Sequence, residues 1–377
     1  MKTAYAWSVG GARGLARSLA LCASAAAQLG ALAALVLLVP WASAPAARAG
    51  GTAPVWIDTD AACGEGGAAD VDDCWALALA LASPELEVRG IGTVFGNVDM
   101  ALAHGVARAV LDRVATGAPP PLFAGAVDPA TPFEANAAAR ALARALERER
   151  LVVVALGPLT NLAAVLDRRP ELAGRIERVI AVLGQRPGQR FFPGASRLLH
   201  FHDLNLRKDP DAVAGVLASG VPLVLLPFEA ATKVTIGPRD LNRLADSGPR
   251  GASLADRSRA WLAYWRDWLG TEGFHPFDSL AVGYAVRPEL FGCESLPARL
   301  ERRPSLLFQR SSLEVAREVA DGRVVTYCTG VGPRFKDELL GRLEDTEWRG
   351  AGAQGSDSTA PARHAGRWPG AGPAPER

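Results

Sequence analysis

Acidic residues gather at two neighbouring places near the start of the chain. Asp58 and Asp60 follow the apolar run 55–57, whereas Asp72 and Asp73 open a helix-like segment after a glycine-rich stretch. If the chain turns back between them, several carboxylates converge, and their mutual repulsion favours binding of protons or a cation. A hard, oxygen-seeking metal ion suits ligands of this kind. Separately, two acids at a helix start are also explained by the helix dipole.

Short apolar runs alternate with helical patterns along most of the chain, and this alternation predicts the fold. The expected strands are rich in leucine or β-branched residues, as buried parallel strands are, and lie at 55–57, 88–94, 151–156, 179–183 and 221–226. The expected helices lie at 72–81, 101–115, 136–149, 160–166 and 210–218. We therefore predict an α/β fold, a mostly parallel central sheet of the open, Rossmann-like type with helices on both faces.

The later part of the chain carries weaker patterns. We expect mostly helix over 238–286, a strand pair within 306–327 and a closing helix at 331–343. Ligands of open α/β sheets bind at the carboxyl ends of the strands. Asp58 and Asp60, then Gly96-Asn97, then the run Gly157-Pro158-Leu159-Thr160-Asn161 all follow predicted strands. The predicted site therefore lies at this edge. Taken singly, Asn97 is equally explained as a turn residue and Thr160 as a helix N-cap.

The two ends of the chain differ in composition from its middle. Residues 1–49 combine early positive charges, a long apolar run and small-residue sites, which predicts a signal peptide or an N-terminal membrane anchor, and hence an exported protein, periplasmic or extracellular. Residues 350–377 are rich in Gly, Ala, Pro and Ser, so we expect a disordered tail. One α/β domain would occupy 50–349. The net charge of +1 argues against nucleic acid as a partner.

Four cysteines follow the predicted signal, namely Cys63, Cys74, Cys293 and Cys328. In an oxidising compartment they permit three pairings, between which the sequence does not choose, and buried free thiols are an equal alternative. A bridge between Cys63 and Cys74 would tie the glycine-rich loop to the start of the helix.

Several short runs occur together in one order across residues 55–286. They are Asp58-Thr59-Asp60, Asp72-Asp73, the run 91–98, the run 155–162, Asp203-Leu204-Asn205 and Asp278-Ser279-Leu280-Ala281-Val282. In this order the chain resembles the inosine-uridine preferring nucleoside hydrolase family, as a divergent member. The resemblance implies an enzyme of the glycosidase class that hydrolyses the N-glycosidic bond of a ribonucleoside or related ribosyl compound. The partner is then a nucleoside-like small molecule, and related proteins assemble as homodimers or homotetramers.

The resemblance also implies the site. A Ca²⁺ ion would be held by Asp60, Asp73, the carbonyl oxygen of Leu156 and Asp278, with water and two ribose hydroxyls completing its shell. Asp60 would be the general base for a water molecule activated by this ion. The ribose would be bound by Asp72 and Asn97, with Asp203 and Asn205 on its far side.

The chain departs from the family pattern at three places. The loop 61–71 is longer than the family's short turn and adds the acids Glu65 and Asp70. Arg197 stands where an Asn would contact the ribose 5′ end, which favours a 5′-modified or anionic substrate, although a surface arginine is the plainer explanation. Phe277 stands where a His acid is common, so His275, or else His200 or His202, is the candidate acid for the leaving base.

An aromatic stripe and two other functions complete the predictions. Trp261, Tyr264, Trp265 and Trp268 share one helix face, which suits a base pocket, core packing or a subunit contact. The first alternative function is a non-catalytic ribosyl-ligand binding protein on the same fold. The second is a phosphotransferase of another α/β fold, which leaves the run 157–161 unexplained.

Overall fold

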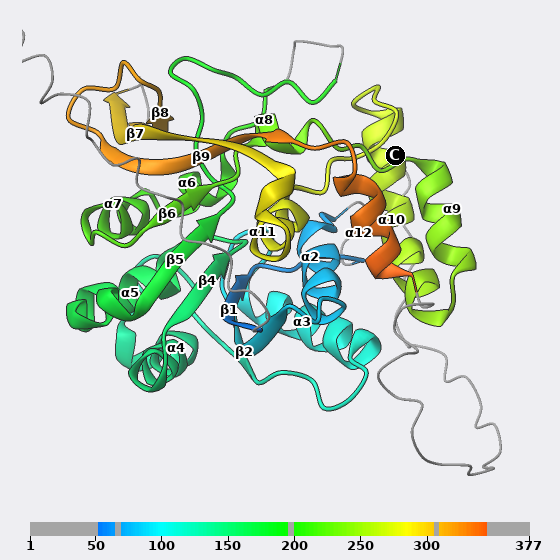
Figure 1. Cartoon of the computed structure of the whole chain (residues 1–377), viewed down its shortest axis with the longest axis horizontal. Coiled ribbons are helices and arrows are strands. Elements are labelled where there is room, and N and C mark those ends of the chain that lie inside the picture. Colours follow the sequence, from blue (N-terminus) through cyan, green and yellow to red (C-terminus); the bar gives the residue numbers. More distant parts are fainter. Residues whose placement is uncertain (1–51, 65–68, 195–199, 305–308, 345–377) are drawn as a thin grey trace, which may run out of the picture. The chain divides into compact units, whose positions relative to one another are not determined.

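The nine-stranded sheet at the centre of the protein is mostly parallel, as predicted. The structure is a computed structural model, and it describes residues 52–64, 69–194, 200–304 and 309–344. The strands lie in the order β3-β2-β1-β4-β5-β6-β9-β7-β8 (Figure 1). Their bounds are β1 Ala53–Thr59, β2 Leu86–Thr93, β3 Leu122–Phe123, β4 Leu151–Ala155, β5 Ile176–Ala181, β6 Leu223–Leu225, β7 Phe291–Pro304, β8 Gln309–Val315 and β9 Arg323–Val331.

Helices cover both faces of the sheet and pack on two separate hydrophobic cores (Figure 1). One core is built with α2 Asp72–Leu81, α3 Met100–Val114, α9 Pro238–Asp246, α10 Pro249–Asp267, α11 Phe277–Val286 and α12 Phe335–Leu343. The other core is built with α4 Ala137–Arg148, α5 Thr160–Arg168, α6 Leu204–Lys208 and α7 Pro210–Ala218. The short helix α8 Phe228–Ala231 follows β6, and three 3-10 turns lie at Phe133–Ala135, Pro170–Arg175 and Pro288–Leu290.

The switch in strand order places the predicted site. From β1 the chain builds outward through β2 and β3 in one direction, and from β4 through β5 and β6 in the other. Both β2 and β4 pair in parallel with β1. The connections that follow β1 and β4 therefore lead away from each other and leave a crevice at the carboxyl ends of these two strands. Ligands of doubly wound sheets bind in a crevice of this kind. Asp58 and Asp60 lie at the end of β1, and Leu156 directly follows β4.

The last part of the sheet corrects one prediction. Besides β8 and β9, the chain forms β7, a strand of 14 residues that was not predicted. It pairs antiparallel with β9 and with β8. Its sequence hides the strand because Pro297, Pro304 and several charged residues interrupt any apolar run, and most of its side chains are not buried. The prediction of two strands within 306–327 was therefore incomplete.

Two disulfides join segments of this domain. Cys63 and Cys74, with Cα atoms 6.3 Å apart, link the loop after β1 to the first turn of α2. Cys293 and Cys328 form a cross-strand bridge between β7 and β9. The four cysteines are thus paired, and free thiols are the wrong alternative.

The predicted signal or anchor, 1–49, and the predicted tail, 350–377, lie outside the described residues. The last helix of the domain, α12, ends at Leu343. Within the described ranges, no helix combines the length and apolar character needed to cross a membrane.

Candidate active site

Asp60 and Asp73 form the buried floor of the site. Asp60 follows β1, Asp73 is the second residue of α2, and both are at most 1% exposed. Asp73 accepts hydrogen bonds from the Thr59 hydroxyl and, at 3.1 Å, from the Asp60 backbone N–H. The Asn97 side chain donates to Asp73 over 3.3 Å, and its backbone N–H donates to Asp60 over 2.7 Å. The strand end and the helix start therefore meet, as predicted.

Two glycines make room for the Asp60 carboxylate. A Cβ on Gly96 would lie 1.8 Å from Asp60 Oδ2, and a Cβ on Gly157 would lie 3.0 Å from Asp60 Oδ1. Neither glycine has a positive φ, so close approach and not backbone conformation explains them. Both belong to the runs that the sequence places at strand ends, and their role is to let the carboxylate lie between them.

Helix α11 brings a distant part of the chain to the same point. Asp278 is its second residue, is 6% exposed and lines the cavity above the floor. Asp72, at the start of α2, accepts a hydrogen bond of 3.1 Å from the backbone N–H of Phe277. This contact spans 205 residues of sequence and fixes the two helix starts against each other. The acids at the start of α2 thus do more than favour a helix N-terminus.

The opposite wall of the cavity comes from the segment before α6. Asp203 is the N-cap of α6 and accepts hydrogen bonds from the backbone N–H groups of Leu206 and Gly184, at 3.0 and 2.9 Å. Asn205 donates to the carbonyl oxygen of Leu156 over 2.7 Å. Because a carbonyl oxygen has two lone pairs, this bond leaves Leu156 able to bind a second partner.

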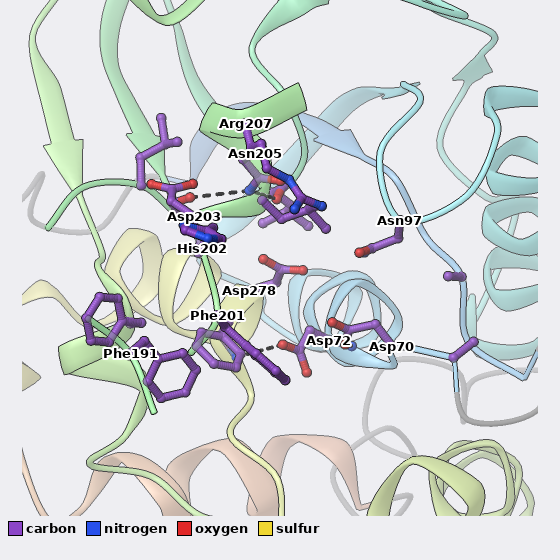
Figure 2. A pocket seen from close by; sticks show the side chains of 18 of the residues that line it. Asp70, Asp72, Asn97, Phe191, Phe201, His202, Asp203, Asn205, Arg207 and Asp278 are labelled. Carbon is purple, nitrogen blue, oxygen red and sulfur yellow. Dashed lines mark hydrogen bonds between the residues drawn. The ribbon is translucent and has the colours of Figure 1, made fainter. Parts of the chain in front are cut away.

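The cavity above these residues has a volume of about 540 Å³. Figure 2 shows Asp278 near its centre, with Asp70, Asp72 and Asn97 to one side of it. An aromatic wall completes the cavity and consists of Phe191, Phe201, Phe228, Trp261, Trp265 and Phe277. A cavity of this size, polar at one end and aromatic at the other, fits a small molecule with a hydroxylated part and a flat ring.

Burial and mutual repulsion dominate the electrostatics of the site. Burial raises the pKa of Asp60 well above its usual value, and the charge of Asp73 raises it further. Burial likewise raises the pKa of Asp278 and of Asp72, and neighbouring carboxylates add to both shifts. Burial raises the pKa of Asp73 too, against the hydrogen bonds it accepts. Binding of a proton or of a cation would relieve this repulsion.

The donor set tests whether a divalent ion fits. Asp60, Asp73, Asp278 and the Leu156 carbonyl are all oxygen donors, and no His or Cys shares the floor, which suits Ca²⁺ and argues against zinc. Within the described ranges, however, no three His, Cys, Asp or Glu side chains are already arranged as a closed metal site. Asp73 accepts hydrogen bonds from the Asp60 N–H and from the Asn97 side chain, and Asp60 accepts one from the Asn97 N–H.

The predicted acid His275 does not line the cavity. His275 is 9% exposed, donates from Nδ1 to the carbonyl oxygen of Val234 over 2.8 Å, and packs against Trp265 with ring centroids 5.2 Å apart. Burial lowers its pKa. Its catalytic role stays a prediction, and His200 and His202, which line the cavity, are better placed. Arg197 lies outside the described residues.

The four aromatic residues predicted to share one face of α10 differ in their surroundings. Trp261 and Trp265 line the cavity. Tyr264 stacks on Trp261 with centroids 5.4 Å apart, whereas Trp268, at the end of the helix, is 81% exposed.

Asn161 and Thr160 have structural roles. The Asn161 side chain accepts from the Ala126 N–H and from Asn136 and donates to the carbonyl of Thr93, all within 3.1 Å and buried. Thr160 donates to Asp209, the N-cap of α7, over 2.6 Å. Asn161 thus joins three segments beneath the site.

Sequence reasoning missed Arg207, Phe191, Phe201 and Phe228, all of which line the cavity. The run Arg190-Phe191-Phe192-Pro193 was the available signal for Phe191, since adjacent aromatic residues in a loop often mark a binding surface. Arg207 follows the Asp203-Leu204-Asn205 run by two positions and carried no signal of its own.

An open α/β sheet with buried carboxylates at its switch point and an aromatic-walled cavity above them defines a nucleoside hydrolase-like protein. A family model described as "Inosine-uridine preferring nucleoside hydrolase" matches residues 55–337, and the chain belongs to this family. The chain is accordingly an enzyme of the N-ribosyl hydrolase, or glycosidase, class. The phosphotransferase alternative is therefore wrong.

Relatives and solved structures agree with the family. The chain is 31% identical over 249 residues to the pyrimidine-specific ribonucleoside hydrolase RihA of Klebsiella pneumoniae (strain 342), covering 58% of this chain and 78% of the relative. It is 28% identical over 263 residues to the non-specific ribonucleoside hydrolase RihC of Escherichia coli O1:K1 / APEC, covering 63% and 80%. The fold resembles the purine-preferring ribonucleoside hydrolase from Gardnerella vaginalis, with a TM-score of 0.63, 23% identity and coverage of 78% and 99%.

Proposed function

We propose that the protein hydrolyses the N-glycosidic bond of a ribonucleoside or related ribosyl compound with the help of Ca²⁺, and that Asp60 is the general base. The observation that carries this proposal is the meeting of Asp60, Asp73 and Asp278, from a strand end and two helix starts, at a cavity that Asp278 lines. Family membership supports the reaction class and a divalent metal. Calcium itself is inferred from the oxygen-only donor set.

Asp60, Asp73, Asp278 and the carbonyl of Leu156 would hold the ion. When bound, a divalent cation makes a contacting water molecule easier to deprotonate and favours the ionised form of the surrounding carboxylates. Asp60 suits the role of base because its carboxylate lies at the floor beside the proposed ion, which would keep it ionised and able to accept a proton. The Asn97 N–H holds its Oδ2 in place, so a proton would be accepted at Oδ1.

The walls of the cavity would orient the substrate. Asp72 and Asn97 on one side, and Asp203 and Asn205 on the other, offer oxygen and amide groups for sugar hydroxyls. The aromatic wall offers faces on which a nucleobase can stack. As the base leaves, the ribose acquires oxocarbenium character, and nearby carboxylates stabilise that positive charge. His200 and His202 are the wall residues able to give a proton to the departing base.

The disulfides support export. Two bridges among the described residues are typical of a protein from an oxidising compartment. We therefore propose a periplasmic or extracellular enzyme, anchored in the membrane only if segment 1–49 is retained, and assembled as a homodimer or homotetramer. Mass spectrometry of the native protein would detect removal of the segment, and light scattering would give the subunit number.

The activity test compares nucleosides in the presence and absence of chelator. Purified protein is incubated with inosine and uridine, and release of free base and reducing sugar is followed. We expect release that chelator abolishes and Ca²⁺ restores. Asp60→Asn should reduce the rate by at least about a thousand-fold without unfolding the protein. Asp112→Asn, at an exposed acid of α3, is the matched control and should keep the wild-type rate.

Full activity of Asp60→Asn would refute the role of Asp60. Tight nucleoside binding without any base release over a long incubation would instead support the non-catalytic binding protein.

A further inference from the structure

Arg207 lines the cavity and is the sole guanidinium among the described residues that do so. It lies in the last turn of the short helix α6, two positions after Asn205, and its side chain is exposed. In the part of the chain that the structure describes, this side chain makes no ion pair or hydrogen bond. An unpaired cation thus faces the space in which the substrate would lie.

The absence of a partner has a local cause. Asp203 precedes Arg207 by four positions, a spacing at which Asp and Arg side chains often pair on a helix. Here both oxygens of Asp203 are already used, one by the Leu206 N–H at the helix N-terminus and the other by the Gly184 N–H. Backbone N–H groups therefore take up the carboxylate of Asp203, and the guanidinium of Arg207 stays available for another partner.

The position of Arg207 tells which part of a substrate it would meet. In Figure 2, Arg207 and Asn205 lie on one side of Asp278, and Phe191 and Phe201 lie on the other. A base stacked on the aromatic side would be remote from Arg207, so the group that the guanidinium meets belongs to the sugar. The acidic floor takes two ring hydroxyls in the proposed mode of binding, which leaves the 5′ carbon facing α6.

Two histidines, His200 and His202, also line the cavity, with ring centroids 4.6 Å apart. Burial lowers the pKa of His202, and the charges of His200, Arg207, Arg310 and Arg190 lower it further, so several positive side chains lie around this imidazole. Asp70, Asp72 and Asp278 line the floor and repel an anion there. At the α6 end the one lining carboxylate is Asp203, whose two oxygens accept from backbone N–H groups, and Arg207 supplies the positive charge.

We propose, on the basis of the hydrolase function above, that Arg207 binds an anionic group at the 5′ end of the ribose, and that 5′-phosphorylated ribosyl compounds are the preferred substrates. A planar guanidinium binds phosphate through two parallel hydrogen bonds, which an uncharged 5′ hydroxyl cannot offer. The inference rests on Arg207 and is independent of Arg197, which lies outside the described residues.

The test compares each nucleoside with its 5′-monophosphate. For wild type with Ca²⁺, kcat/KM is measured for inosine, uridine and their 5′-monophosphates. We expect a preference for the phosphates of about ten-fold or more, the factor typical of charge-assisted hydrogen bonds. Arg207→Gln should abolish this preference. Arg144→Gln, at an exposed arginine of α4, should keep it.

Two results would overturn the inference while leaving the proposed function intact. One is hydrolysis of nucleosides with no preference for the phosphates, and the other is a preference that survives in Arg207→Gln. If neither class of compound is hydrolysed, the proposed function fails. Calorimetry with ribose 5-phosphate then tests the anion site at Arg207 by itself. Binding weakened about ten-fold by Arg207→Gln would then support the anion site, and equal or absent binding would overturn it.

Discussion

Gly96→Ala is the sharpest test of how the floor of the site is built. The added Cβ would lie 1.8 Å from Asp60 Oδ2, whereas ordinary contact begins at 3.4 Å, so the carboxylate must move by about 1.6 Å. That movement breaks the hydrogen bond from the Asn97 N–H, and a bond to a charged group contributes about 1.5–3 kcal/mol. Misplacing a catalytic group by about 1 Å costs about a hundred-fold in rate, so we expect kcat/KM to fall by at least that factor.

The assay measures nucleoside hydrolysis together with Ca²⁺ affinity by calorimetry, with circular dichroism as the check on folding. Gly105→Ala is the matched control, because Gly105 lies exposed in α3 and an added Cβ there meets nothing within 4 Å. It should leave activity unchanged and stabilise the protein by about 0.5–1 kcal/mol. A folded Gly96→Ala variant with activity and Ca²⁺ affinity within about three-fold of wild type would refute the reasoning, with the fold-change judged against the hundred-fold expectation.

Three further predictions concern charge, cross-links and buried polar groups. Burial raises the pKa of the floor acids above their ordinary value of 3.8, so their contribution to the stability of the metal-free protein is complete below that value and is lost as pH rises through the raised pKa values. Ca²⁺ should therefore increase the melting temperature more at pH 8 than at pH 5, and an equal increase would contradict the cation site. Replacing Cys63 and Cys74 by Ala should cost about 2–4 kcal/mol and weaken Ca²⁺ binding, whereas the same change at Cys293 and Cys328 should cost stability alone, as denaturation and calorimetry would show. Asn161→Ala should destabilise by about 3 kcal/mol, because three buried groups lose their partner; a loss under about 1 kcal/mol in urea denaturation would mean that water replaces it.

Strand ends and helix starts were predictable because local chemistry marks them. Helices α2 and α7 have the predicted bounds, 72–81 and 210–218. In α7, Pro210 occupies the first turn and the Asp209 side chain accepts from the Ala212 N–H, so the start is determined by neighbouring residues. Strand β7 was missed because its pairing with β9 depends on residues far away in sequence and not on an apolar run of its own.

The acidic floor was predictable for a different reason from the rest of the site. Asp60 stands at a strand end and Asp73 at the following helix start, and the rule that ligands bind at the carboxyl ends of strands brings them together, whereas Asp278 was assigned through the family resemblance. The direction in which a loop side chain points follows no such rule. His275 is adjacent to the site in sequence but faces Val234, whereas Arg207 and Phe191 reach the cavity because of how the connections between β5 and α7 fold.

Two sets of glycines in this enzyme can be engineered separately. At Gly92, Gly96 and Gly157 a methyl group would meet the side chains of Asp58 or Asp60, so substitution there alters the active site. At Gly105 and Gly215, in the outer helices α3 and α7, the space around the backbone is open. Thermal tolerance can therefore be raised at the outer set without altering the chemistry, while natural variation at the inner set is expected to be narrow.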